Sequence, residues 1–95
     1  MTLLSPDKLY LRRELQGSRV GEDLVIFDDR VGKYFATGPV GADIWDMLAT
    51  PTSPDAMHAK LMAMYDIDDA TCRTQISDFL VKMAEADLVA EVPAA

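Results

Sequence analysis

The sequence predicts an α+β domain in which a three-stranded antiparallel sheet packs on three helices. Between Val20 and Thr37 it has two runs of β-branched and aromatic residues, which are typical of a short hairpin. A hairpin of this length is not stable alone and has to pack on other elements. After Thr37 the chain carries helix caps and helical apolar spacing. With 95 residues, 49% of them apolar, we expect one domain over residues 1–95, with its core at about 8–92.

The hairpin is expected from strands at Asp23–Asp28 and Lys33–Thr37. In the turn between them, Asp28 can accept hydrogen bonds from nearby backbone, and Gly32 can take the positive φ that a bulged hairpin needs. Upstream, the alternation of Leu9–Glu14 predicts a strand that pairs with Asp23–Asp28, although the same residues suit a turn of helix. This order places Lys33–Thr37 at the edge of the sheet.

Two further segments are expected outside the hairpin and the helices. Gln16–Gly21 has two glycines and a serine, so we expect it to be a connector. Leu88–Val92, near the end of the chain, is expected to add a short extended piece.

Three helices are expected after the hairpin. Pro39 suits a first helical turn, where its missing N–H costs nothing, while Ser53 and Asp68 are typical N-caps. Apolar residues then recur at helical spacing behind each start. The expected helices are Pro39–Ala49, a second from Pro54 to near Tyr65, and Asp69–Ala86. A small sheet followed by three helices is an architecture of winged helix-turn-helix type.

The residues that carry chemistry in other proteins have structural explanations here. Cys72 falls on the apolar stripe of the third helix, so we expect a buried hydrophobic residue, and one cysteine excludes an intrachain disulfide. His58 falls on the polar side of the second helix, where we expect it to face solvent. Adjacent aspartates suit turns and caps, and neither a glycine-rich phosphate loop nor metal-ligand spacing is present. We therefore expect no enzyme, no catalytic residue, no metal site and no cofactor.

The charge of the chain argues against nucleic acid as a partner. Residues 34–95 hold three basic and ten acidic side chains, which accounts for the net charge of −7. Affinity for DNA comes mainly from lysine and arginine at phosphates, and in the helical half these are outnumbered by acidic side chains. No run approaches the roughly 18 apolar residues of a membrane span, and no signal-peptide core precedes the domain. We expect a cytoplasmic protein that binds neither nucleic acid nor membrane.

Capture of an extended peptide fits the pattern better. A peptide could pair with the free N–H and C=O groups of an edge strand at Lys33–Thr37. On the third helix, a stripe of mostly small or apolar residues could wall the resulting groove, and Arg73 could meet a peptide carboxylate. Two alternatives stay open for this stripe: it could pack inside the domain, or form a seam between two copies in an assembly module. The stripe consists of Arg73, Ser77, Leu80, Val81 and Ala84.

Residues 20–92 resemble the PqqD-like family, whose members are recognition elements for RiPP precursors, the ribosomally made and post-translationally modified peptides. An acidic turn ends in glycine and an aromatic residue, a Gly-x-x-Ile-Trp run starts the first helix, and a Tyr-Asp-x-Asp junction precedes the third helix. A Phe-Leu pair and an acidic-apolar exit follow. These motifs lie at Asp28–Tyr34, Gly41–Trp45, Tyr65–Asp68, Phe79-Leu80 and Asp87–Val89.

The resemblance implies a non-catalytic protein that binds the leader of a precursor peptide. In this family the leader adds as a fourth strand beside the third, in a cleft walled by the third helix. The implied partner is a processing enzyme, for which we favour the leader peptidase of a lasso-peptide pathway over the radical-SAM enzyme of pyrroloquinoline quinone synthesis. A winged-helix DNA-binding or assembly module is the further alternative. The implied peptide-binding residues are Lys33, Tyr34, Phe35, Ala36, Thr37, Arg73, Ile76, Ser77, Leu80, Val81 and Ala84.

Overall fold

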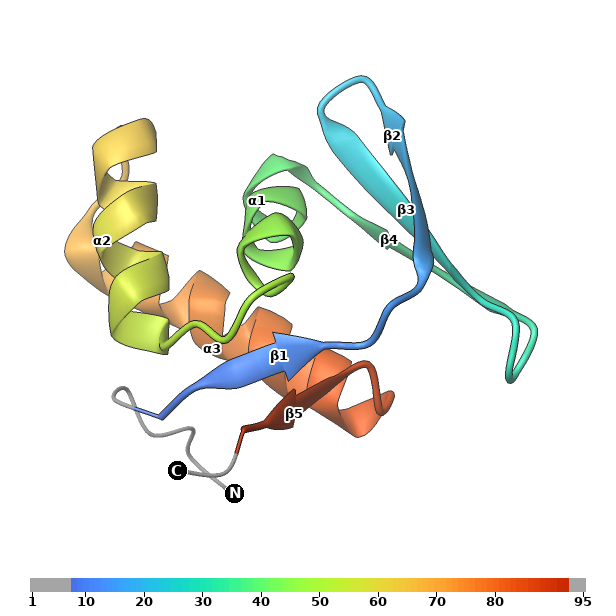
Figure 1. The fold of residues 1–95 in the computed structure, drawn as a ribbon. Helices are drawn as coiled ribbons and strands as arrows, with labels where there is room; N and C mark the ends of the chain where they lie inside the picture. Colours follow the sequence, from blue (N-terminus) through green and yellow to red (C-terminus); the bar gives the residue numbers. More distant parts are fainter. Residues whose placement is uncertain (1–7, 93–95) are drawn as a thin grey trace.

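A computed structural model describes residues 8–92 (Figure 1). The three helices lie together, the main sheet stands beside α1, and a separate strand pair lies across the C-terminal part of α3. The expected α+β architecture of a three-stranded antiparallel sheet on three helices is confirmed. The elements are β1 (Tyr10–Arg12), β2 (Gln16–Val20), β3 (Asp23–Asp28), β4 (Lys33–Thr37), α1 (Pro39–Met47), α2 (Pro54–Met64), α3 (Asp69–Glu85) and β5 (Val89–Glu91).

The main sheet has the order β2-β3-β4, with both pairings antiparallel. The expected hairpin is therefore confirmed, including the positive φ of Gly32, which is 66°. The first strand of the sheet is Gln16–Val20, so its assignment as a connector was wrong. Its glycine has a local purpose: a Cβ on Gly17 would lie 3.1 Å from Leu24 Cδ1, so the glycine lets β2 approach that buried side chain.

The segment expected to pair with the hairpin pairs instead with the end of the chain. Tyr10 of β1 lies opposite Glu91 of β5, and its N–H donates to Thr52 O at 2.9 Å. The expected pairing of Leu9–Glu14 with Asp23–Asp28 was therefore wrong. The physical reason is burial, because Tyr10 is 5% exposed and packs in the helical core, away from the sheet.

The helix starts follow the expected caps. Ser53 Oγ accepts from Ala56 N at 3.1 Å, and Asp68 Oδ2 accepts from Thr71 N at 3.1 Å, so two orphan N–H groups are satisfied. At α1 the N-cap is Gly38, which makes no side-chain cap hydrogen bond. The three helices end one or two residues before the expected positions, within the usual variation of helix ends.

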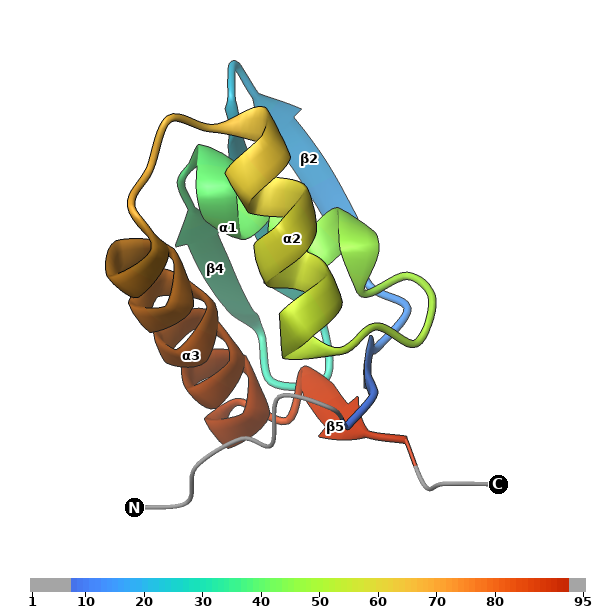
Figure 2. The same cartoon turned by 90° about the vertical axis from the view of Figure 1, so that its left-hand side faces the viewer.

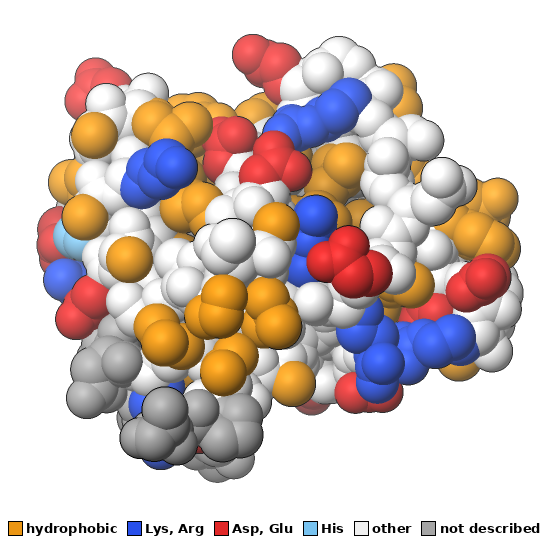
Figure 3. Space-filling view, in the orientation of Figure 1, with side chains coloured by type: hydrophobic (Ala, Val, Ile, Leu, Met, Phe, Trp, Pro, Cys, Tyr) orange, Lys and Arg blue, Asp and Glu red, His pale blue; other side chains and the backbone are white. Residues whose placement is uncertain are grey.

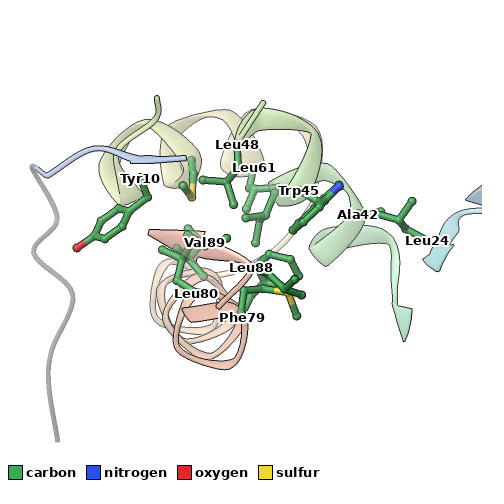
Figure 4. Packing of buried hydrophobic residues seen from close by; sticks show 14 of the residues in the cluster. Tyr10, Leu24, Ala42, Trp45, Leu48, Leu61, Phe79, Leu80, Leu88 and Val89 are labelled. Atoms are coloured by element: carbon green, nitrogen blue, oxygen red, sulfur yellow. The ribbon is translucent and has the colours of Figure 1, made fainter. Parts of the chain in front are cut away.

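The core lies where the three helices meet β3 and the β1–β5 pair. Figure 4 shows Trp45, Leu48 and Leu61 pointing toward side chains of α3 and β5. Cys72 is fully buried, as expected. The largest buried apolar side chains are Trp45, Ile26, Ile44, Leu48, Met57, Leu61, Leu80, Met83 and Leu88. Among residues 8–92, none of the helices combines the length and apolar character that crossing a membrane requires.

Candidate functional site: the β4 edge and the groove beside it

β4 is an edge strand of the main sheet, because β3 is its one neighbour in the sheet order. Phe35 lies opposite the buried Ile26, so alternate residues from Lys33 to Thr37 face the helices. Tyr34 lies opposite Phe27 and therefore belongs to the outer face. In an antiparallel ladder, alternate residues of an edge strand direct their N–H and C=O groups away from the partner strand. β4 thus presents free backbone groups on one side and a helix-facing row of side chains.

A groove of about 370 Å³ opens where the end of β4 turns into α1 and faces α3. One wall is the chain from Thr37 to Gly41, and the other is α3 at Gln75, Asp78 and Phe79. On α3 these three positions are neighbours at the i, i+3 and i+4 spacing, so they share one face of the helix. The groove therefore lies between the last residue of the edge strand and the middle of α3.

Gly41 lies where the end of β4, the start of α1 and α3 come close together at the groove. A Cβ at Gly41 would lie 1.7 Å from Thr37 Oγ1, 2.9 Å from Thr37 Cβ and 3.1 Å from Phe79 Cδ1. The first two distances are shorter than real Cβ contacts, so only glycine lets β4, α1 and α3 meet this closely. The Gly-x-x-Ile-Trp run thus begins with the glycine that lets the end of β4 approach α1 and α3.

The other end of β4 is tied to the end of α3 by arginine. Arg30, in the β3–β4 turn, places Nη2 2.7 Å from Asp28 Oδ2 and Nη1 3.3 Å from Asp87 Oδ2. Asp87 also accepts from Arg13 Nη2 at 2.6 Å. The side-chain hydrogen bonds from Arg30 lower the pKa of the Asp28 carboxyl, and those from Arg13 and Arg30 lower the pKa of the Asp87 carboxyl. The β3–β4 turn, the segment at Arg13 and the residue that follows the end of α3 are thereby joined by charge-assisted hydrogen bonds.

The two ties show that β4 runs antiparallel to the second half of α3, as Figure 2 shows. From Thr37 back to Lys33 the strand covers about 14 Å. From Phe79 to Glu85, where α3 ends, the helical rise is about 9 Å. The two contacts thus lie near the two ends of β4, one at the middle of α3 and one just beyond its end.

The structure separates the two halves of the expected peptide-binding set. All five β4 residues lie on the edge strand, as expected from the sequence. Arg73, however, is directed toward α2, with Nη1 3.5 Å from Asp55 Oδ1 and Nε 3.4 Å from Asp69 Oδ2. Ser77, at i+4 from Arg73, shares its side of the helix. That stripe does not wall the groove at Thr37–Gly41.

Helical geometry and burial account for the remaining members of the set. Ile76 and Leu80 are 3% and 1% exposed, so they are core residues. Ala84, at i+7 from Ser77, continues the stripe toward the C-terminal end of α3, and Val81 is half-buried. The α3 residues at the groove that the sequence did not indicate are Gln75, Asp78 and Phe79.

One protein family matches most of the chain. Residues 23–89 match the family model described as "Coenzyme PQQ synthesis protein D (PqqD)". The chain belongs to the PqqD family. The matched residues of this PqqD-family chain run from the start of β3 to the start of β5 and so include β4, α1 and α3. No curated protein sequence matches the chain significantly.

Three solved structures share the fold of this PqqD-family chain. One is "TbiB1 in Complex with the TbiA(beta) Leader Peptide", with 22% identity, a TM-score of 0.74, and coverage of 88% of this chain and 99% of that one. "Lasso peptide synthetase B1 complexed with the leader peptide" has 20% identity, a TM-score of 0.71 and coverage of 88% and 98%. The PqqD truncation of Methylobacterium extorquens PqqCD, a stand-alone RiPP recognition element, has 13% identity, a TM-score of 0.73 and coverage of 92% and 94%.

The one cysteine and the one histidine of this PqqD-family chain lie in packed surroundings. Cys72 is buried, and burial raises the pKa of its thiol. The expectation that His58 faces solvent was wrong, because its side chain is 15% exposed and Nε2 lies 2.8 Å from Asp69 Oδ1. This contact links α2 to the start of α3. Within residues 8–92, no three histidine, cysteine, aspartate or glutamate side chains are grouped to hold a metal ion.

Proposed function

We propose that this PqqD-family protein binds the leader of a ribosomally synthesised precursor peptide and presents it to a processing enzyme, without catalysing a reaction itself. The observation that carries the proposal is the open edge of β4 beside the groove at α3. The complexes of TbiB1 and lasso peptide synthetase B1 with leader peptides, which have this fold, support it. The recognition element of Methylobacterium extorquens supports the same class of function.

The leader adds as a fourth strand beside β4. The sheet also has a second edge at β2, but β2 does not border the groove, whose α3 wall faces the end of β4. A peptide on β4 therefore gains side-chain contacts that a peptide on β2 would lack. Its side chains on the helix side lie over Phe79 and Gly41, between Thr37 and Gln75.

The free energies of strand addition indicate that the groove determines which peptide binds. Each main-chain hydrogen bond contributes a net of about 0.5–1.5 kcal/mol. Ordering one peptide residue costs about 1–2 kcal/mol. The two terms nearly cancel along the strand, so the ladder sets the register while burial of apolar side chains in the groove supplies net affinity. A peptide with the wrong side chains at the groove would pair with β4 weakly.

The proposed binding residues follow from this geometry. The strand residues are those expected from the sequence, Lys33–Thr37. On the helix we propose Gln75, Asp78 and Phe79 in place of the stripe at Arg73, because these three border the groove. Ile76 and Leu80 act through packing, since they hold α3 against the core.

We further propose a lasso-peptide pathway and a leader peptidase as the partner enzyme. The support is sequence identity. The leader-bound structures of TbiB1 and of lasso peptide synthetase B1 share 22% and 20% identity with the chain, against 13% for the PqqD recognition element. The alternative within the family is delivery of the pyrroloquinoline quinone precursor to a radical-SAM enzyme. We place the protein in the cytoplasm, where its one cysteine stays reduced.

The test is a titration with synthetic leader peptides taken from short precursor-like reading frames beside the gene. Gln75→Trp puts a large side chain into the groove, and Thr74→Trp puts the same side chain on an exposed position one residue away. We expect a cognate leader to bind the wild type and the Thr74 variant alike, and the Gln75 variant at least about 10-fold more weakly. Absence of binding by every neighbouring leader would overturn the function. Equal binding of the leader by both variants would overturn the assignment of the groove as its binding site.

A further inference from the structure

The outer face of the main sheet carries an aromatic pair that the groove does not use. Tyr34 of β4 and Phe27 of β3 lie directly opposite each other, with ring centroids 4.7 Å apart and planes tilted by 40°. Tyr34 is 70% exposed and Phe27 36%. Apolar side chains reach the surface over the sheet at the right of Figure 3. Large exposed apolar side chains gathered on one face are typical of a contact surface.

The register shows what would lie next to this pair. The cross-strand row runs from Gln16 of β2 through Phe27 to Tyr34, where it stops because β4 is the edge. A strand added to β4 extends the row by one side chain, whose Cβ lies about 4.5–5.5 Å from that of Tyr34. Aromatic residues in such rows pair most favourably with aromatic or β-branched partners. Strand addition would thus cover the side of Tyr34 that the sheet leaves open.

We infer that a peptide added to β4 makes side-chain contacts on both faces of the sheet. The peptide residue opposite Tyr34 then carries a large apolar side chain on the outer face. The inference rests on the proposed function, because it takes the leader as the added strand. It names one occupant, the leader itself, because Tyr34 belongs to the strand whose free backbone groups the leader would use. Peptide residues therefore alternate: one lies against Tyr34, and its two neighbours face α3.

The flanking residues favour this arrangement. Ala36, two residues along the same face, is small and leaves space beside the Tyr34 ring. Val25, opposite Ala36, is half-buried and continues the apolar surface. A large peptide side chain opposite Tyr34 thus has apolar neighbours along the sheet as well as across it.

The test is a double-mutant cycle on the protein and a cognate leader. Tyr34→Thr removes the ring and keeps a residue that suits strands, while Val20→Thr changes an exposed side chain of the same face on the opposite edge. We expect Tyr34→Thr to weaken binding about 2- to 5-fold, with Val20→Thr unchanged. For one leader variant, with its outward apolar residue replaced by alanine, Tyr34→Thr should cause no further loss.

Each other outcome is decisive. If a leader binds the wild type and Tyr34→Thr binds as tightly, the inference is wrong and the proposed function stands. If Tyr34→Thr changes only the oligomeric state of the free protein in light scattering, the face is an interface between two copies, and the inference is wrong. If no leader binds the wild type, the proposed function fails and the inference with it. Thermal unfolding monitored by circular dichroism shows that each variant is folded.

Discussion

Arg30 donates three hydrogen bonds to the buried carboxylate of Asp28, from its backbone N at 3.1 Å, from Nε at 3.0 Å and from Nη2 at 2.7 Å. The Asp28 side chain is 1% exposed and that of Arg30 37%. A carboxylate in this position is stable only with its donors in place. Since Arg30 also reaches Asp87, this pair fixes where the Lys33 end of β4 stands against α3.

Arg30→Gln is expected to destabilise the domain, because it leaves the buried Asp28 carboxylate without its charged partner. Arg19→Gln is the matched control, since it removes the same group from an ion pair with Asp46 whose two side chains are 44% and 55% exposed. Exposed pairs contribute little to stability. The measurement is the urea midpoint of unfolding, and equal midpoints for the two variants would contradict a structural role for Arg30.

Acid is expected to destabilise the protein through Asp28 and Asp87. The pKa of each folded carboxyl lies below its ordinary value of 3.8. A lowered folded pKa means that the stabilisation is fully present above about pH 4 and is lost as the pH falls through the folded values. Unfolding in urea between pH 6 and pH 2.5 measures this loss. Asp28→Asn removes one of the titrating groups, so its stability should fall less steeply; parallel curves for variant and wild type would be inconsistent with this assignment.

Gly41→Ala is expected to cost about 1–3 kcal/mol of unfolding free energy, the usual range for overpacking. The new Cβ would overlap Thr37 Oγ1 and come close to Thr37 Cβ, which lies at the groove. Gly38→Ser is the control, because a Cβ there meets nothing within 4 Å and serine is a favourable N-cap. Chemical denaturation of both variants decides the matter, and a Gly41 variant as stable as the Gly38 variant would show that the corner can relax.

On α3, Leu80 and Arg73 are expected to behave differently from each other. Leu80→Ala should cost about 2–5 kcal/mol, because Leu80 is 1% exposed, so loss of peptide binding there would report unfolding. Arg73→Ala removes exposed ion pairs on the side of α2 and should leave both stability and peptide binding near wild type. Calorimetric titration of the Arg73 variant with a cognate leader is the measurement. A large loss of affinity would return Arg73 to the site.

Much of the fold could be predicted because its local signals agree. Ser53 and Asp68 are caps with definite side-chain hydrogen bonds, and Gly32 sits where the turn needs a positive φ. β2 could not be predicted, because all its residues are exposed and its glycine and serine resemble a loop. An edge strand held mainly by its backbone leaves no apolar alternation in the sequence.

The α3 wall of the candidate groove could not be predicted for a different reason. Spacing identifies the stripes on α3, but it does not say whether α2 or β4 lies beside each of them. Arg73 and Gln75 are two residues apart and face opposite neighbours, Asp55 in one case and Thr37–Gly41 in the other. The close approach at Gly41 was the one local signal, since a glycine in an early helical turn indicates a crowded backbone.

Leader binding is expected to slow amide hydrogen exchange at alternate residues of β4 and leave β2 unchanged. The free N–H groups of Lys33–Thr37 become hydrogen-bonded to the added strand, whereas Gln16–Val20 forms the other edge. Two edges in one sheet make the experiment internally controlled, because both strands exchange in the same sample. Exchange followed by NMR with and without a cognate leader gives the pattern. Protection confined to β2 would place the leader on the wrong edge for the α3 groove, and uniform protection of both would indicate a general gain in stability without strand addition.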